Sequence, residues 1–305
     1  MDVYHEPVLG DEVLGLLEPR GVGLYLDGTV GGGGHTRLIL ERCTACRVLA
    51  VDRDPEALEH ARISLAEFGD RVRFRRARFD RALQEDDREG LDGALLDLGV
   101  SSHQIDAEAR GFTFARDVAL DMRMDASGGP DARSFLADAS EERLAQVFRD
   151  FGEEPKARRL AREVVKRRTT APLESSDDLV AALAVTLGRA PSARDKARIF
   201  QAVRIAVNEE LEALERGLPA IREVMNDGAV MVVISYHSLE DRLVKNAFRE
   251  WSLACICPPE VMVCVCRGRP LGQTLTKKPV RPTEEEMRAN PRARSARLRA
   301  WRRAA

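Results

Sequence analysis

Acidic residues stand at the ends of apolar segments, in a spacing that suits a nucleoside-binding site. Asp27 ends the apolar segment 24–27 and is followed by a turn with four consecutive glycines, 31–34. Glycine has no Cβ and tolerates positive φ, so this composition lets the main chain pass close to a bulky ligand. Such a turn also occurs where a strand and a helix only need to pack tightly. The neighbouring residues must therefore decide between a cofactor loop and a packing turn.

A second acid, Asp52, ends the apolar run 47–52. A carboxylate about twenty residues beyond a glycine-rich turn can accept both ribose hydroxyls of an adenosine. A dehydrogenase has the same acid, but this turn lacks the G-x-G-x-x-G order, and Asp27 would repel a pyrophosphate. The methionine part of S-adenosylmethionine carries an ammonium group, which an acid attracts. We therefore expect S-adenosylmethionine as the cofactor.

The apolar pattern predicts a doubly wound parallel α/β sheet that carries these acids at one edge. A third acid, Asp97, lies near the end of the expected strand 93–98, and a later strand is expected at 229–236. The other strands are expected at 24–27, 47–52 and 72–77. Helices are expected at 36–42, 55–68 and 82–89.

A long interval between the last two expected strands predicts an inserted domain. About 130 residues separate 93–98 from 229–236, several times the length that one crossover helix needs. Helical patterns without strand signals fill this interval, at 140–151, 156–168, 176–187 and 197–214. We therefore predict one domain from 1–105 and 210–305, and an inserted all-helical domain at 106–209.

Charge is distributed unevenly along the chain. The 305 residues are 44% hydrophobic, enough for two domain cores, and the net charge is only −2. Yet twelve Lys or Arg stand against three Glu in 267–303, and seven against one in 156–168. A charged run is ordinarily a solvated face, but two such runs beside a cofactor site favour a polyanionic substrate. The first residues resemble no secretory signal, so we expect a cytoplasmic protein without a membrane partner.

Four of the six cysteines form two C-x-C pairs separated by six residues: Cys255, Cys257, Cys264 and Cys266. Four thiolates can hold a zinc ion, although the usual zinc sites have C-x-x-C pairs. Ordinary reduced thiols are the alternative, and the sequence leaves metal binding open. The remaining pair, Cys43 and Cys46, has C-x-x-C spacing outside any thioredoxin-like context, so we expect no redox chemistry there.

Nine segments, in one order along the chain, resemble the signatures of the MraW family, also called RsmH. They include DGTVGGGGH at 27–35, LDLGVSS at 96–102 and ISYHSLEDR at 234–242. The others are 5–9, 51–55, 110–112, 120–124, 200–205 and 290–295. The resemblance implies a class I, Rossmann-like methyltransferase domain with a helical insertion that recognises substrate. It further implies methyl transfer from S-adenosylmethionine to the exocyclic N4 of a decoding-centre cytosine in 16S ribosomal RNA.

The resemblance also implies the cofactor contacts. They fall on Gly33, Gly34, His35, Asp52, Phe79, Asp97 and Gln104. The main chain at the glycines can approach the methionine part, Asp52 suits the ribose diol, and Phe79 can cover the adenine face. Phe79 as a core aromatic and Gln104 as an ordinary loop residue are the structural alternatives. Position 103, where many relatives have proline, is histidine.

Methylation of cytosine N4 requires a group that binds the amine and accepts its proton, because the N4 lone pair is shared with the ring. The base must also leave its stack to reach the methyl group. We expect Asp97 to be the acceptor, with help from Ser101 or Ser102. His237, after the last strand, is a candidate for contact with the base, and a purely structural role is as well supported. Ser238 is expected to cap the following helix, with Asp241 at position N3.

The expected partner is 16S ribosomal RNA in a small-subunit particle, and a homodimer and a monomer both remain open. Two rival functions also remain. A small-molecule methyltransferase would explain the cofactor loop but not the basic segments. A non-catalytic RNA-binding assembly factor would explain the basic segments but would not need an intact cofactor site.

Overall fold

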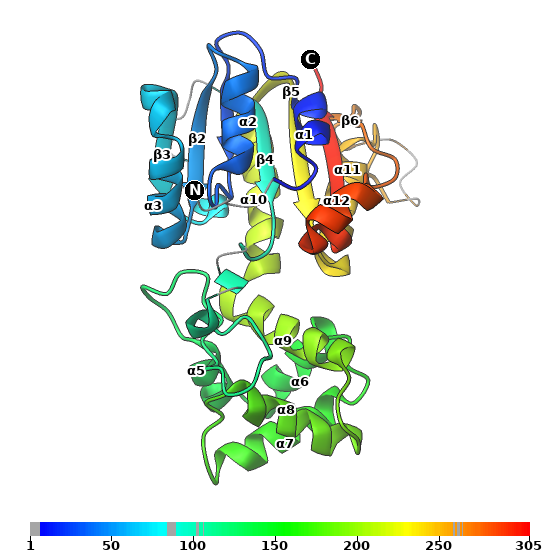
Figure 1. Ribbon diagram of the computed structural model, residues 1–305. Coiled ribbons are helices and arrows are strands. Elements are labelled where there is room, and N and C mark those ends of the chain that lie inside the picture. Colours follow the sequence, from blue (N-terminus) through cyan, green and yellow to red (C-terminus); the bar gives the residue numbers. More distant parts are fainter. Residues whose placement is uncertain are drawn as a thin grey trace. The chain divides into compact units, whose positions relative to one another are not determined.

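A computed structural model of the chain describes residues 7–83, 90–101, 104–105, 107–258, 260, 263 and 265–305. The chain forms two compact units, 1–99 with 211–305 and, separately, 100–210 (Figure 1). We name them the sheet unit and the helical unit. No helix among the described residues is long and apolar enough to cross a membrane.

The sheet unit contains a seven-stranded sheet in the order β3-β2-β1-β4-β5-β7-β6. Its strands are β1 (Leu24–Asp27), β2 (Arg47–Asp52), β3 (Val72–Arg76), β4 (Leu91–Asp97), β5 (Met225–Ser235), β6 (Gly272–Thr274) and β7 (Arg297–Arg303). The first five strands are parallel, and β7 runs antiparallel to both β5 and β6. The strand order reverses between β1 and β4. The predicted doubly wound, Rossmann-like α/β fold is confirmed.

The register of the central strands brings the three acids to one edge. Asp27 lies level with Ala50 of β2 and with Leu95 of β4. Asp52 and Asp97 therefore stand further toward the carboxyl ends of their strands. Because side chains alternate along a strand, all three carboxylates are directed to the same face of the sheet. This edge, beside the reversal of strand order, is where open α/β sheets bind their ligands.

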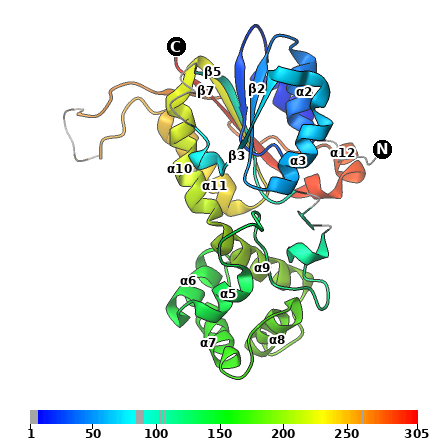
Figure 2. The same cartoon turned by 90° about the vertical axis from the view of Figure 1, so that its left-hand side faces the viewer.

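Helices cover both faces of the sheet (Figure 2). One face carries α1 (Gly10–Leu17), α2 (Gly34–Arg42) and α3 (Pro55–Ser64), and the other carries α10 (Glu210–Val224) and α11 (Ser238–Trp251). The strands read as continuous apolar runs because each is buried on both sides. The expected helix 55–68 ends at Ser64 and continues as a 3-10 turn, Ala66–Arg71. A helix is also expected at 82–89. Its first two residues, 82–83, are not helical, and the rest, 84–89, lies outside the described residues.

Strand β7 shows that the basic segment 267–303, which the sequence links to a polyanionic substrate, is in part a buried strand. It lies inside the sheet, and Leu298, Ala300 and Trp301 are fully buried. Arg299 is 6% exposed, and its guanidinium donates to both carboxylate oxygens of Asp241, at 2.6 and 3.2 Å. Arg299 is therefore not available to a phosphate. Between β6 and β7 lie a short helix, α12 (Glu284–Ala289), and a 3-10 turn, Pro291–Ser295.

The helical unit has a hydrophobic core of its own. Its helices are α5 (Ala132–Asp138), α6 (Glu141–Asp150), α7 (Ala157–Arg168), α8 (Ser176–Leu187) and α9 (Ala193–Asn208). Helix α6 begins where Ser140 accepts the N–H of Arg143, and it buries Leu144 and Phe148. Neighbouring helices add a continuous apolar cluster that includes Leu160, Val164, Leu183, Ile199 and Val203.

The expected single helix 197–214 is wrong, because the chain breaks at Glu209. This residue is in the left-handed conformation with φ 50°, between the end of α9 and the start of α10. Asn208, just before it, accepts the N–H of Met124 at 2.8 Å and donates to the carbonyl of Met122 at 2.7 Å. These long-range contacts are favourable only at one orientation of the last turn of α9. Tertiary contacts thus end a helix that the apolar pattern would continue.

Candidate active site

The glycine-rich turn joins β1 to α2 at the carboxyl edge of the sheet. Gly33 precedes α2 with φ 91°, and a Cβ there would lie 2.9 Å from Leu65 Cδ1. Ser64 Oγ donates to the carbonyl of Gly32 at 2.8 Å, which holds the turn against the end of α3. Glycine at position 33 is therefore required both by its backbone conformation and by packing. A Cβ on Gly34 would face Pro7 at 3.3 Å, a closer approach than most side chains make.

Asp27 anchors this turn from beneath. It is 1% exposed, and its carboxylate accepts the hydroxyl of Thr36 at 2.7 Å and the N–H of Thr29 at 3.3 Å. Burial raises the pKa of Asp27 to about 6, although these hydrogen bonds oppose the rise. The sequence suggested that Asp27 attracts a ligand ammonium. In the structure its carboxylate instead links the start of the turn, at Thr29, to the first turn of α2, at Thr36.

Asp52 ties the turn to β2. Its Oδ2 accepts the N–H of Gly31 at 3.0 Å, and its Oδ1 accepts the N–H of Asp54 at 2.9 Å. The N–H of Arg53 is a third backbone donor to this carboxylate. A carboxylate has about four acceptor positions, so Asp52 keeps capacity for a further donor. Burial raises the pKa of Asp52 to about 6, so the group is mostly ionised at neutral pH. An ionised acceptor at this place suits a ribose diol.

Asp97, at the end of β4, is surrounded by groups from three other segments of the sheet unit. Its N–H donates to Thr29 Oγ1 at 2.7 Å, and its Oδ1 accepts the hydroxyl of Tyr236 at 2.9 Å. The other oxygen, Oδ2, lies 3.7 Å from His35 Nδ1. The side chain of Asp97 is 23% exposed, so the carboxyl can be reached from solvent. The structure thus brings together Asp97 and His35, two of the predicted site residues.

The environment of Asp97 favours its neutral form. Burial raises the pKa of Asp97 to about 7, the hydrogen bond from Tyr236 opposes the rise, and the negative charge of Glu240 adds to it. The pKa of the Tyr236 hydroxyl is raised well above its usual value, first by burial and then by Asp97. Tyr236 therefore stays protonated and remains a donor. A carboxyl that titrates near neutrality is suited to proton transfer.

His35 is a neutral group that supports this arrangement. Its Nε2 lies 2.9 Å from the carbonyl oxygen of Val8, which can only accept, so Nε2 carries the hydrogen. In the neutral ring, Nδ1 is then an acceptor that faces Asp97. Burial lowers the pKa of His35, which keeps the imidazole uncharged. At neutral pH the contact with Asp97 is therefore not an ion pair.

The segment after β5 corrects the predicted cap of α11. His237, not Ser238, is the N-cap, and its Nδ1 accepts the N–H of Glu240 at 3.4 Å. Glu240 is at position N3 in place of Asp241, and its carboxylate accepts the N–H groups of Tyr236 and His237 at 2.9 and 3.3 Å. His237 has an extended backbone, which directs its ring over the first turn of the helix. This capping box holds Tyr236 beside Asp97, and it gives His237 a structural role. Contact of His237 with a base stays a prediction.

The structure shows other contacts for the remaining predicted site residues, and Phe79 is the one among them that reaches the glycine-rich turn, where a Cβ on Gly28 would lie 3.2 Å from Phe79 Cβ. Phe79 follows β3, and its ring packs where a Cβ on Gly217 of α10 would stand, 2.5 Å away. Gln104 belongs to the helical unit, where its Oε1 accepts the N–H of Ser101 at 3.0 Å, and Ser101 Oγ accepts the N–H of Gln104 at 3.2 Å. These bonds close a local turn. Ser102, as well as His103, lies outside the described residues.

Tyr236 and Thr29 are the functional residues that the sequence analysis missed. The apolar run before Tyr236 predicts a strand that ends at this residue, and this pattern gives its hydroxyl no role. A signal was present, since Tyr236 stands one residue beyond β5, at the same edge as Asp97. At the opposite edge, a surface hollow is lined by Tyr25 and Asp92 among others, and it lies away from the three acids.

Known proteins similar to this chain cover almost its whole length. A curated protein of Gemmatimonas aurantiaca named "Ribosomal RNA small subunit methyltransferase H" is 53% identical over 305 residues, covering 98% of this chain and 95% of that protein. A protein of the same name from Heliobacterium modesticaldum is 48% identical and covers 98% of both chains. A third, from Pelobacter propionicus, is 47% identical and covers 97% of both.

A family model agrees with these relatives. The model of the MraW methylase family matches residues 2–304. The match includes the glycine-rich turn, the three acids at the carboxyl edge and the segment from Tyr236 to Glu240. The chain belongs to the MraW methylase family.

Proposed function

We propose that this protein transfers the methyl group of S-adenosylmethionine to the exocyclic N4 of a cytosine in the decoding centre of 16S ribosomal RNA. We place the reaction in the cytoplasm, on a small-subunit particle. Its relatives carry the name ribosomal RNA small subunit methyltransferase H, which supports the RNA class. The single observation that carries the proposal is the carboxyl of Asp97, which has a pKa of about 7 and is held by Tyr236 at the carboxyl edge.

Members of the MraW methylase family use S-adenosylmethionine, so the chain is a methyltransferase that depends on this cofactor. The residues at the carboxyl edge fit it. Asp52 keeps acceptor capacity for a ribose hydroxyl, and the glycine-rich turn offers a main chain without side chains. S-adenosylmethionine supplies a methyl group on a positively charged sulfur, which leaves as a neutral thioether. We assign Gly33, Gly34 and Asp52 to its binding.

We infer that Asp97 binds the amine and accepts its proton. Tyr236 donates to Oδ1, which orients the carboxyl, and Oδ2 lies 3.7 Å from His35 Nδ1. The ionised form accepts a hydrogen bond from the N4 amine, and it can take the proton that the methylated nitrogen releases. A pKa close to the working pH lets one group perform both steps. His35 remains neutral beside it and limits the space around the carboxyl.

Removal of the Asp52 carboxylate is expected to weaken cofactor binding. In Asp52→Ala the ribose loses its acceptor, and the turn loses the bonds to Gly31 and Asp54. The expected cost is about 1–3 kcal/mol of binding free energy, measured by calorimetry. Asp92→Ala is the matched control, because Asp92 accepts two hydrogen bonds at the opposite edge of the sheet. Equal affinity of Asp52→Ala and the native protein would remove Asp52 from the site.

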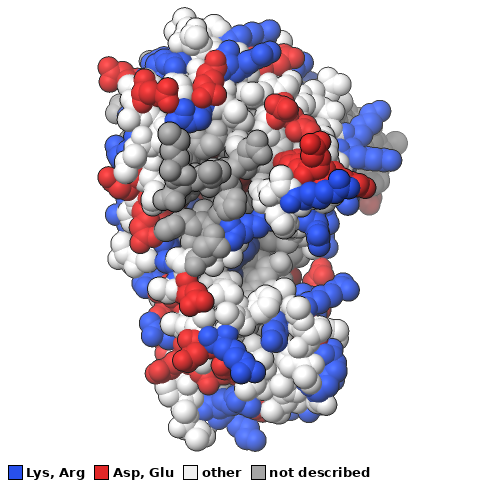
Figure 3. All heavy atoms as spheres, in the orientation of Figure 1, with Lys and Arg blue, Asp and Glu red and all other residues white. Residues whose placement is uncertain are grey.

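Helix α7 supports the RNA part of the proposal. Arg158, Arg162 and Lys166 are exposed and stand four residues apart, so they follow one side of the helix. Lys and Arg side chains lie over the part of the helical unit that α7 occupies in Figure 1 (Figure 3). Such a row of cations can neutralise successive phosphates and release their counterions.

Replacing Arg158, Arg162 and Lys166 with Gln is expected to reduce the salt dependence of RNA affinity. The slope of log affinity against log salt should fall by up to about 2–3 if all three side chains contact phosphate. The control removes three exposed arginines at the amino edge of the sheet: Arg20, Arg42 and Arg47. Filter binding at several salt concentrations measures both. Equal slopes for both variants would show that α7 is only a solvated face.

Methyl transfer from labelled S-adenosylmethionine tests the proposed function directly. We expect label on small-subunit particles that lack the modification, with naked 16S ribosomal RNA and free cytidine as competing acceptors. Digestion to nucleosides should then yield N4-methylcytidine from a single decoding-centre site. Label at another atom or another RNA would refute the proposed target, and label on free cytidine alone would favour a small-molecule methyltransferase.

A further inference from the structure

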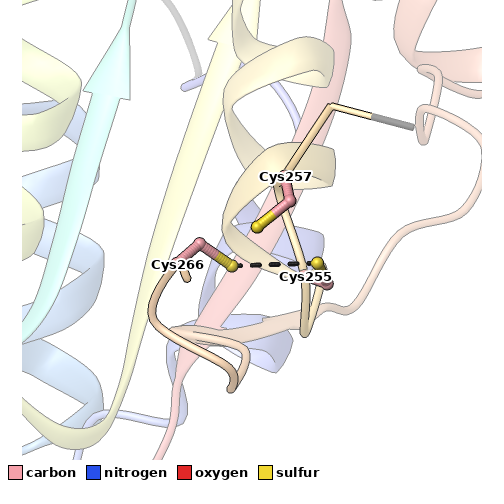
Figure 4. A group of neighbouring side chains, drawn as sticks. All are labelled: Cys255, Cys257 and Cys266. Carbon is pink, nitrogen blue, oxygen red and sulfur yellow. Dashed lines mark hydrogen bonds between the residues drawn. The ribbon is translucent and has the colours of Figure 1, made fainter. Parts of the chain in front are cut away.

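Three cysteines that the methyl-transfer site does not use lie together in the segment between α11 and β6. The Sγ atoms of Cys255, Cys257 and Cys266 are all within 4.8 Å of one another. The structure has all three as thiols. Figure 4 shows the three side chains converging from two stretches of the segment. Residues nine or more apart in the sequence are thus brought to one point by the fold.

The distances between the sulfurs fit a shared metal ion. Two thiolates bound to one zinc ion at about 2.3 Å in tetrahedral geometry have sulfurs about 3.8 Å apart. The Sγ atoms of Cys255 and Cys266 are 3.8 Å apart, well beyond the length of a disulfide bond. This spacing would need little movement of the side chains on metal binding.

The backbone around the cluster supports the same conclusion. The N–H of Ile256 donates to Cys266 Sγ at 3.3 Å, a bond that stabilises a negative sulfur and orients it. At the base of the segment, Arg267 donates to the carbonyls of Glu250 and Leu253, and Leu271 N–H donates to the carbonyl of Trp251 at 2.8 Å. The two ends of the segment are therefore held together without the cysteines. The three cysteines can therefore form a second cross-link within the segment, separate from these hydrogen bonds at its ends.

We propose that Cys255, Cys257 and Cys266 bind a zinc ion that fixes the segment after α11. Zinc prefers thiolate ligands in tetrahedral geometry, and three protein sulfurs leave one position for a fourth ligand. Each cysteine loses its thiol proton as its S–Zn bond forms, so binding releases up to three protons. Cys264 lies outside the described residues and is not part of the proposal.

A metal cross-link would stabilise this segment, which has little hydrophobic core of its own. Ile256, Val263 and Val265 are 43%, 75% and 80% exposed, so the segment buries few apolar groups of its own. Without a core, a segment of this kind needs a metal or a disulfide to keep one conformation. The zinc site is structural, since it is distinct from the acids at the carboxyl edge and supplies no group to the transfer.

Metal content of the purified full-length protein tests the proposal. We expect about one zinc ion per chain by mass spectrometry of the metal after purification without chelator. Cobalt(II) in place of zinc should give the thiolate-to-metal charge-transfer bands of a sulfur-coordinated site. Both signals should be lost in Cys255→Ser, Cys257→Ser and Cys266→Ser, while circular dichroism and S-adenosylmethionine affinity should stay close to native.

The matched control is the double variant Cys43→Ser/Cys46→Ser, which removes two sulfurs from the same chain at another place. In the structure these two cysteines are buried and joined by a disulfide, a pairing that the sequence analysis did not expect. The control should keep its zinc. Chelation should also speed alkylation of Cys255 and Cys257 in the native protein. Three results would each overturn the proposal. They are a native protein without metal, zinc that is retained by all three Ser variants, and a disulfide between Cys255 and Cys266 detected by peptide mass.

Discussion

The Asp97→Asn variant is expected to bind S-adenosylmethionine and to lose about 10²–10⁴-fold in turnover with RNA, the usual contribution of a positioned general base. The amide keeps one oxygen that can accept the hydroxyl of Tyr236, so the local arrangement survives. It has no charge to stabilise the amine as positive charge develops, and it cannot accept a proton. The loss should therefore fall on turnover and not on cofactor affinity.

Asp92→Asn is the matched control, because Asp92 is a carboxylate on the same strand, β4, near its amino end. Its carboxylate accepts two hydrogen bonds, from Leu24 N–H and Asn226 Nδ2, and the carboxylate of Asp97 accepts one, from Tyr236. Single-turnover rates with saturating cofactor separate chemistry from binding. Native turnover in Asp97→Asn would exclude this carboxyl from the reaction.

The pH dependence of turnover gives a second readout of the same group. The rate should rise as Asp97 ionises, around pH 7 in the absence of other effects, because only the carboxylate accepts the proton. Tyr236→Phe removes a hydrogen bond that favours the ionised form, so it should move this rise to higher pH. In Asp97→Asn the rise should disappear.

The same Asp97→Asn variant is expected to be more stable than the native protein at pH 8, by about 1–3 kcal/mol. Burial raises the pKa of Asp97 from 3.8 to about 7 in the folded protein. Because the folded protein raises this pKa, it favours the neutral carboxyl over the ionised one. The contribution of neutral Asp97 to the free energy of unfolding is therefore fully present below about pH 4, and it is lost as pH rises through about 7. The amide stays neutral at every pH. The expected gain in unfolding free energy is smaller than the full change in pKa implies, because the side chain of Asp97 is 23% exposed and solvent screens its charge.

Urea unfolding of the cofactor-free protein at pH 4 and pH 8 measures this difference. The advantage of Asp97→Asn over the native protein should be large at pH 8 and close to zero at pH 4. Comparison of variant with native protein removes the contributions of other groups, such as Asp27 and Asp52, whose pKa values are also raised. A variant that is less stable at both pH values would show that the carboxylate of Asp97 is needed to hold the fold.

Local patterns in the sequence determined the sheet and the position of its acids. Continuous apolar runs that end in Asp27, Asp52 and Asp97 predicted buried parallel strands, and parallel strands bring their carboxyl ends to one edge. The glycine-rich composition predicted a turn between a strand and a helix, and the long interval before β5 predicted the inserted helices. These features could be predicted because each depends on the composition of a short segment or on the length between segments. Contact of this turn with a cofactor stays a prediction.

Only the tertiary structure decided which groups surround Asp97. Tyr236 and His35 reach it from segments far away in the sequence, and their roles depend on hydrogen bonds that no local pattern encodes. The same holds for Arg299, which belongs to a basic segment but lies in β7 inside the sheet, where it pairs with Asp241. The sequence alone does not show whether a charged side chain contacts a phosphate or a buried carboxylate. Its partner is chosen by packing, which acts over the whole chain.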